Sequence, residues 1–245
     1  MKKILLCILS IFIIFLLYLL YPAPQNINDP IDSAIYLSIG KNIQNAAKQL
    51  LAQNPSPEPI VVQNKLDIPQ IVQETNIYCV PACIQMTLRY HNIEANQEDL
   101  AEQLRTSSVT GTEYIDMARV LNTYLFHKET LSDDQESGYR IQNINCNETS
   151  EEVSNIFQKR VERNIQDGYP VFAAINLHSL YPSLPSANHM VVVNGYIKEN
   201  EEISSYYVID PYGPVQDPVY GGQKIFTSDE LLQAILENEE PAYLW

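Results

Sequence analysis

A change in hydrophobic spacing part-way along the chain most constrains its fold. Four segments space their apolar residues as helices do: 76–90, 96–104, 112–125 and 150–166. Three later segments are rich in β-branched and aromatic residues, which is typical of strands: 171–177, 190–197 and 206–209. Helices first and strands later favour an α+β fold, with a helical half followed by an antiparallel sheet half, over alternating βαβ units.

Local signals mark where several helices begin. Asn96 and Thr227 are residue types that accept hydrogen bonds from a first helical turn, and an acidic residue follows each of them three positions later. Thr227 therefore predicts a last helix over 227–236. Pro81 fits the first turn of the helix predicted over 76–90, because a missing N–H costs no hydrogen bond there.

The N-terminus carries an unbroken apolar run over residues 4–21, preceded by Lys2 and Lys3. About 18 helical residues span about 27 Å, close to the ~30 Å hydrocarbon core of a membrane. The run predicts an uncleaved membrane anchor or a cleaved signal peptide, since both place positive charge before an apolar segment. Lys2 and Lys3 favour a cytoplasmic N-terminus, so the rest of the chain is expected on the extracytoplasmic side, anchored or secreted.

The sequence predicts three regions along the chain. Residues 1–24 are the predicted signal anchor or signal peptide. Residues 25–59 are a predicted helical stalk and linker, because apolar residues in 31–52 have helical spacing and a breaker cluster follows at 53–59. Residues 60–245 are the predicted working domain, which opens with an extended segment.

Charge and cysteine content narrow the function. The net charge of −15 argues against a nucleic-acid partner, because Lys and Arg must neutralise phosphates in such a complex. Of the four cysteines, Cys7 lies in the apolar run, which leaves Cys79, Cys83 and Cys146. With three cysteines in an oxidising compartment, at least one thiol has no disulfide partner, and a disulfide between Cys83 and Cys146 stays open.

Cys79 lies near the start of the helix predicted over 76–90. The unpaired N–H groups of a helix tip favour negative charge, and with a cationic neighbour they lower the pKa of a thiol from about 8.5 to about 3.5–7.5. Because the thiolate is the nucleophile, Cys79 is the candidate nucleophile. Cys83, one turn later, is expected to be buried and inert. A structural pair of small residues, or a disulfide between the two, is the alternative.

A cysteine nucleophile needs a base, and His189 begins one predicted strand while Asp210 ends the next. If the two strands form a hairpin, His189 and Asp210 lie within one to three register steps of each other. The Asp then fixes the imidazole tautomer and stabilises the imidazolium. His178 is the best substitute base. The scattered Cys and His residues lack the spacing of a zinc site, so no metal or other cofactor is expected.

These residues resemble the motifs of the bacteriocin-processing (double-glycine leader) cysteine peptidase family. Gln73 lies six residues before the segment 79–83, which reads Cys-x-Pro-Ala-Cys. His189 before an apolar strand, and the Asp-Pro-Tyr turn at 210–212, are similar to the family's His and Asp motifs. The resemblance covers about residues 60–245.

The resemblance implies a papain-like cysteine peptidase fold, with Cys79 on a helical half and His189 on a sheet half. It also implies that the Gln73 side chain and the backbone N–H of Cys79 donate to an oxyanion. Val80 departs from the family, which usually has Gly after the catalytic Cys. The chain also lacks the Walker-type glycine-rich loop of the transporter-fused members, so double-glycine leader specificity is not carried over.

The expected function is that of an extracytoplasmic cysteine hydrolase, peptidase-like, which cleaves a peptide or amide bond through a Cys79–His189–Asp210 triad. Its partners are then a peptide or protein substrate and, through the N-terminal helix, a membrane. Two alternatives stay open. One is a catalytically inactive papain-like module that binds peptides at the cell surface, which Val80 favours. The other is an amidase or acyltransferase that acts on cell-wall peptide.

Overall fold

The computed structural model describes residues 41, 60–133 and 135–245 of the chain. The predicted signal anchor or signal peptide at 1–24 lies outside these residues, and so does the stalk and linker at 25–59 except for Lys41, which is helical. Within the described residues, no helix combines the length and the apolarity that a membrane crossing requires. Residues 60–245 belong to one structural unit, and the description below concerns that unit.

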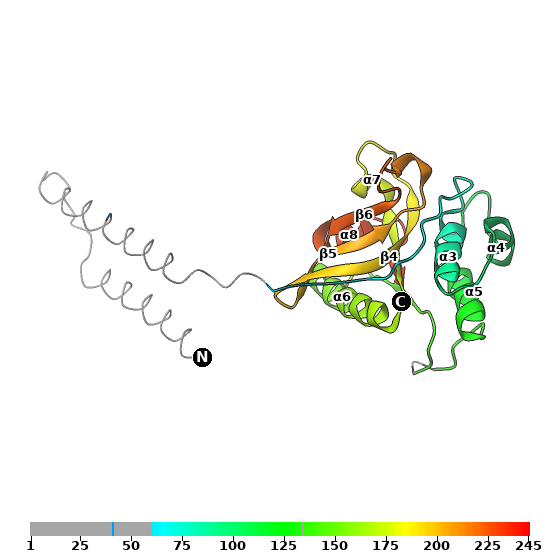
Figure 1. Ribbon diagram of the computed structural model, residues 1–245, viewed down its shortest axis with the longest axis horizontal. Coiled ribbons are helices and arrows are strands. Elements are labelled where there is room, and N and C mark those ends of the chain that lie inside the picture. The colour runs from blue at the N-terminus through cyan, green and yellow to red at the C-terminus, as the bar shows by residue number, and fades with distance from the viewer. Residues whose placement is uncertain (1–40, 42–59, 134) are drawn as a thin grey trace, which may run out of the picture. The chain divides into compact units, whose positions relative to one another are not determined.

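Three helices make up the first half of this unit (Figure 1): α3 (Cys79–Tyr90), α4 (Gln97–Gln103) and α5 (Tyr114–Phe126). All three were predicted, although α3 begins three residues later than its pattern suggested, at Cys79 itself. Asn96 caps α4 as expected, since its side chain accepts from the backbone N–H of Asp99 at 2.8 Å. The apolar faces of α3, α4 and α5 pack together, and α3 also packs against β4 (Asn188–Glu199).

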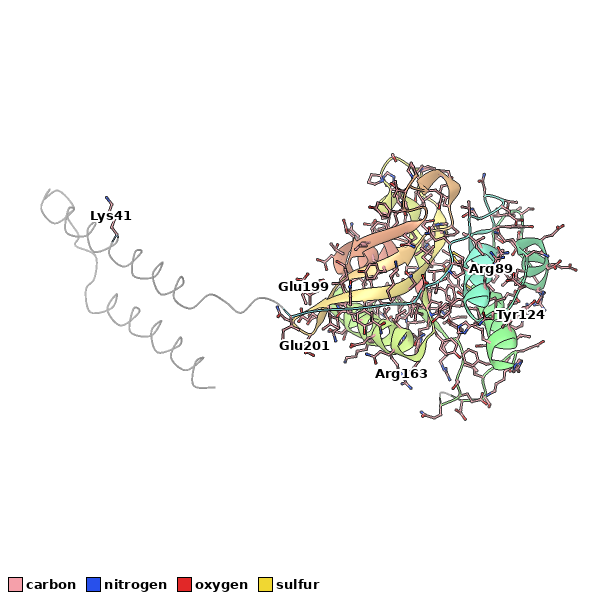
Figure 2. All side chains as sticks on the ribbon, in the orientation of Figure 1. Lys41, Arg89, Tyr124, Arg163, Glu199 and Glu201 are labelled. Atoms are coloured by element: carbon pink, nitrogen blue, oxygen red, sulfur yellow. The ribbon has the colours of Figure 1, made fainter. Side chains whose placement is uncertain are left out.

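The second half is an antiparallel sheet whose strands lie in the order β2-β7-β3-β4-β5-β6, with β1 paired to β4 as well. The strands are β1 (Val61–Lys65), β2 (Ile141–Asn143), β3 (Val171–Asn176), β4, β5 (Glu202–Ile209), β6 (Gln223–Thr227) and β7 (Ala242–Leu244). The β4–β5 hairpin turns at residues 200–201, and Figure 2 labels Glu199 and Glu201 at its tip. The prediction of an α+β fold, a helical half followed by an antiparallel sheet half, is confirmed.

Helices α6 (Ser150–Asp167) and α8 (Ser228–Leu236) pack against the sheet and against each other. Both begin with a reciprocal capping box: Thr149 with Glu152, and Thr227 with Glu230. Sequence patterns missed α7 (Leu177–Leu180), β2, β6 and β7. These elements have three to five residues, which is too short for a periodic pattern to show.

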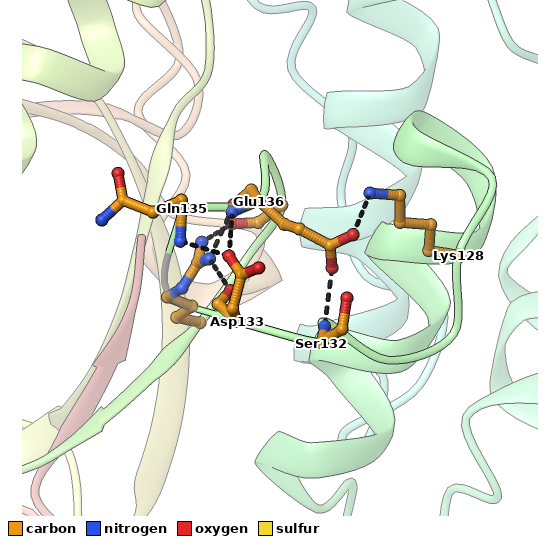
Figure 3. A network of polar contacts seen from close by, with 7 residues as sticks. Lys128, Ser132, Asp133, Gln135 and Glu136 are labelled. Carbon is orange, nitrogen blue, oxygen red and sulfur yellow. Dashed lines mark hydrogen bonds and ion pairs between the residues drawn. The ribbon is translucent and has the colours of Figure 1, made fainter.

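The connection over 127–140 joins the helical half to the sheet half, and polar contacts hold it (Figure 3). Glu136 pairs with Lys128 at 2.8 Å and accepts from the backbone N–H of Ser132. The guanidinium of Arg140 donates to the carbonyl oxygens of Asp133 and Glu136. Side chains thus satisfy backbone groups of a segment whose described residues form no strand or helix.

One hydrophobic core serves both halves. Its fully buried side chains include Ile84 and Leu121 from the helices, Phe172 and Val192 from the sheet, and Phe157 from α6. Because these residues share one core, the helical half is fixed against β4 by apolar burial, at about 25 cal/mol for each Å² removed from water.

A substitution at Gly195 tests how closely β1 packs against β4. A Cβ at this position would lie 2.5 Å from the carbonyl oxygen of Asn64 and 2.8 Å from Cα of Lys65, both on β1. We expect Gly195→Ala to lower the free energy of unfolding by about 1–3 kcal/mol, because two backbones must separate. Gly213→Ala, where the nearest heavy atom is 3.8 Å away, is the matched control and is expected to be near neutral. Urea unfolding measures both, and equal midpoints would contradict the close approach.

Candidate active site

Cys79 is the first residue of α3, so its sulfur lies at a helix tip. No acidic residue occupies the first turn of α3, and Pro81 removes one of the N–H groups there. The side chain is partly exposed and lines a cleft of about 490 Å³ between the helical half and the sheet half. Val80, at 4% exposure, lines the same cleft.

His189 reaches the same cleft from the start of β4. It is 7% exposed, and its Nε2 lies 2.7 Å from Oδ1 of Asp210. The charge of His189 also lowers the pKa of the Cys79 thiol. Because Asp210 engages Nε2, the ring nitrogen that Asp210 leaves unused is Nδ1. The structure thus places Cys79 and His189 on one cleft and joins His189 to Asp210 by a hydrogen bond.

Asp210 follows β5 directly and is 1% exposed. The register of the hairpin brings it near His189, since Val192 pairs with Ile209. Besides His189, its carboxylate accepts from the backbone N–H of Tyr212 at 2.8 Å and from the hydroxyl of Tyr181 at 2.8 Å. Three donors therefore compensate a carboxylate that is almost fully removed from water.

The electrostatics of the site favour a charged pair. Burial opposes ionisation of Cys79, but the hydrogen bond and charge of His189, with the backbone N–H groups of Met190 and Val80, outweigh it and lower the pKa of the thiol. Burial also opposes the imidazolium, yet the charge and hydrogen bond of Asp210 and of Cys79 raise the pKa of His189 to about 10. As pH rises, the thiol therefore loses its proton before the imidazolium does.

Cys83 behaves in the opposite way. It is fully buried, and its S–H donates to the carbonyl oxygen of Met190 at 3.4 Å. Burial, followed by the charges of Cys79 and Asp210, raises the pKa of this thiol well above its ordinary value. Cys83 is thus buried, as predicted. Cys79, Cys83 and the exposed Cys146 are all free thiols, so neither disulfide that the sequence left open is present.

Gln73 lies beside the turn that follows Asp210, because its backbone N–H donates to the carbonyl oxygen of Pro211 at 2.9 Å. Its side-chain Nε2 donates to the carbonyl oxygen of Thr75, while its buried Oε1 has no partner among the described residues. Gln97 holds the backbone on both sides of Gln73: it donates to the carbonyl oxygen of Val72 and accepts from the N–H of Glu74. Sequence analysis did not identify Gln97.

The remaining histidines occupy other environments. His178, the substitute base of the sequence analysis, lies in α7 with its Nδ1 2.7 Å from the carbonyl oxygen of Leu184. His91 stacks on Tyr169 with ring centroids 5.0 Å apart, and His127 ends α5 in a left-handed conformation. None of the three lines the cleft of Cys79. In the part of the chain that the structure describes, no three His, Cys, Asp or Glu side chains lie together as metal ligands would.

Tyr181 is a further site residue that the sequence did not reveal. It follows α7, and its ring packs edge-on against Phe226 with centroids 6.1 Å apart. Burial and the charge and hydrogen bond of Asp210 raise the pKa of its hydroxyl, so the phenol stays protonated as the donor. No spacing or motif marks this residue, because its partner lies 29 positions away in the sequence.

Comparisons with known proteins were made for the whole sequence. The model of a family described as "Peptidase_C39 like family" matches residues 65–228, more than half of the chain. No curated protein matches the sequence.

Solved structures that are similar to the chain include the following three. A double glycine motif protease from an AMS/PCAT transporter, in complex with the leader peptide, is 14% identical, with a TM-score of 0.45 over 77% of this chain and 96% of that one. A C39-like peptidase from Bacillus anthracis is 15% identical, with a TM-score of 0.48 over 75% and 96%. The peptidase domain of Streptococcus ComA, a bi-functional ABC transporter involved in quorum sensing, is 11% identical, with a TM-score of 0.42 over 71% and 94%.

The hydroxyl of Tyr181 can be removed with little change in shape. We expect Tyr181→Phe to lower the free energy of unfolding by about 1–3 kcal/mol, because the buried Oδ2 of Asp210 then lacks a donor. Tyr220→Phe, at a residue that is 67% exposed, is the control and is expected to have no effect. Thermal unfolding of both variants measures the difference. A Tyr181→Phe variant as stable as the control would show that the bond does not contribute to stability.

Proposed function

The chain belongs to the Peptidase_C39-like family of cysteine peptidase-like enzymes, and from that premise we propose that it cleaves a peptide or amide bond with a Cys79–His189–Asp210 triad. The family match agrees with the resemblance predicted from the motifs and with a papain-like α+β fold, in which the helical half carries the cysteine and the sheet half the histidine. The observation that supports the triad best is the buried 2.7 Å contact of His189 with Asp210, joined to a thiol of lowered pKa.

The proposed reaction proceeds in two halves. The thiolate of Cys79 attacks the carbonyl carbon of the substrate, and the imidazolium of His189 gives its proton to the leaving amine as the C–N bond breaks. A water molecule then loses a proton to His189 and attacks the thioester carbonyl, and the C–S bond breaks to release the acid and restore the Cys79 thiolate beside the His189 imidazolium. Asp210 keeps the imidazole oriented throughout.

Gln73 and the helix tip are the proposed donors to the oxyanion of each tetrahedral intermediate. The first N–H groups of a helix have no partner within it, so the N–H of Cys79 is available. Nε2 of Gln73 has two N–H groups, of which the carbonyl oxygen of Thr75 takes one. The contacts of Gln97 on both neighbours of Gln73 support this proposal, because an oxyanion donor must be held in place.

A surface module that binds peptides without cleaving them is the second candidate. Val80 favours it, since a β-branched residue that lines the cleft beside the nucleophile narrows the approach of a substrate backbone. The two candidates differ in one property that needs no substrate: only the enzyme requires an activated thiol.

Alkylation of the full-length chain with limiting iodoacetamide between pH 5 and pH 9, mapped by mass spectrometry, tests whether His189 activates the thiol of Cys79. We expect modification of Cys79 to rise with pH well below the ~8.5 of an ordinary thiol, because His189 lowers the pKa of Cys79. In His189→Ala the rise is expected to move to higher pH and the rate at pH 7 to fall about ten-fold, since each pKa unit is ten-fold in thiolate. Cys146, an exposed thiol in the same chain, is the internal reference.

Two results would count against the triad. One is a Cys79 that reacts no faster than Cys146 at any pH, and the other is a profile that His189→Ala leaves unchanged. Either result favours the binding module.

We also propose that the working domain lies on the extracytoplasmic side, anchored by residues 4–21 or released after their cleavage. The support is Lys2 and Lys3 before that apolar run. In intact cells that express the Cys79→Ala variant, a membrane-impermeant maleimide is expected to label the exposed Cys146 before lysis, and a further Cys146→Ser change is expected to abolish that label. Labelling only after lysis would place the domain in the cytoplasm.

A further inference from the structure

The ionisable residues around Cys79 and His189 have one sign of charge. Glu113, Glu239 and Glu240 line the cleft, and no Lys or Arg of the described residues does. None of these three carboxylates has an ion-pair partner in that part of the chain. The cleft that contains the nucleophile thus presents uncompensated negative charge to whatever occupies it.

The carboxylates come from both walls of the cleft. Glu113 precedes α5 on the helical half, whereas Glu239 and Glu240 lie between α8 and β7 on the sheet half. The hydroxyl of Tyr114 donates to the carbonyl oxygen of Glu240 at 2.9 Å, which joins the two walls. A group bound between them therefore faces acidic side chains from both sides.

Glu239 is held next to the catalytic histidine. Asn188 precedes His189, and its Nδ2 donates to Oε2 of Glu239 at 3.2 Å. Its Oδ1 accepts from the backbone N–H of Glu239 at 3.3 Å. One hydrogen bond to the carboxylate and one from the backbone N–H, both with Asn188, hold Glu239 at the edge of the site, and Oε1 of Glu239 has no partner among the described residues.

The charges act on one another across the cleft. The pKa of Tyr114 is raised first by burial, and then by the charges of Glu240, Cys79 and Glu113. One hydroxyl thus feels the carboxylates of both walls together with the sulfur.

From this arrangement we propose that the cleft selects cationic peptides, those with Lys or Arg within a residue or two of the bond that is cleaved. The proposal rests on the proposed function, since it assigns a substrate class to that site. A Lys or Arg side chain would pair with carboxylates that now have none, whereas Asp or Glu at the same place would meet like charge.

The overall charge of −15 offers a competing explanation, in which any acidic surface attracts cations. Two variants with the same change in net charge distinguish the two explanations. Glu113, Glu239 and Glu240 are changed together to Gln in one variant, and Glu199, Glu201 and Glu202 in the other. The second set lies at the tip of the β4–β5 hairpin (Figure 2), about 36 Å along β4 from Asn188 at ~3.3 Å per residue.

The probe is a set of peptides of one length and sequence that carry Lys, Gln or Glu at the positions flanking the central bond. Their binding to the full-length Cys79→Ala variant is measured by calorimetry, and their cleavage by the wild-type chain is measured by mass spectrometry. We expect the Lys peptide to bind about ten-fold tighter than the Gln peptide at low salt, and the Glu peptide to bind more weakly than both. The preference is expected to shrink in 0.5 M salt.

The variant with Gln at 113, 239 and 240 is expected to lose this order of peptide affinities. The variant with Gln at 199, 201 and 202 is expected to keep it. Equal affinities for the three peptides, or the same loss in both variants, would overturn the proposal. Tighter binding of the Lys peptide without any cleavage would support the selectivity while it overturned the proposed hydrolysis. Cleavage of all three peptides at one rate, with equal binding, would support the proposed hydrolysis and overturn the selectivity.

Discussion

The buried contact between His189 and Asp210 is the interaction on which the rest of the site depends. Moving an unpaired carboxylate into the interior costs several kcal/mol, so Asp210 is tolerated at 1% exposure only because donors surround it. His189 comes from β4, Tyr212 from the turn after β5, and Tyr181 from the segment after α7. The hairpin register, the turn and that segment must therefore all be in place before the pair is stable.

The second requirement is a fixed distance between the two halves. Cys83 lies one turn after Cys79 on α3, and Met190 follows His189 on β4. The S–H of Cys83 donates to the carbonyl oxygen of Met190, so neighbours of the proposed nucleophile and the proposed base are in direct contact inside the core. Apolar residues surround this contact, and burial raises the pKa of the Cys83 thiol.

The buried site and the outer cleft also differ in charge. His189, whose pKa is raised, lies between a buried carboxylate and a thiol of lowered pKa, while the charged side chains of the described residues that line the outer cleft are carboxylates. A positive group at the centre suits an oxyanion that forms during a reaction, and a negative rim suits a cationic substrate. The two requirements are compatible because the imidazolium is buried and the rim is exposed to water.

Local spacing and short motifs in the sequence were enough to predict the longer helices and strands in order, the capping of α4 and α8, and Cys79, His189 and Asp210 as candidate site residues. Which other groups contact these residues follows from the tertiary structure. Tyr181, Gln97 and Glu239 come from distant parts of the chain, and β2, β6 and β7 are too short to give a period. Local propensity acts over a few residues, whereas sheet pairing and a shared core join residues far apart, so no pattern along the chain records those contacts.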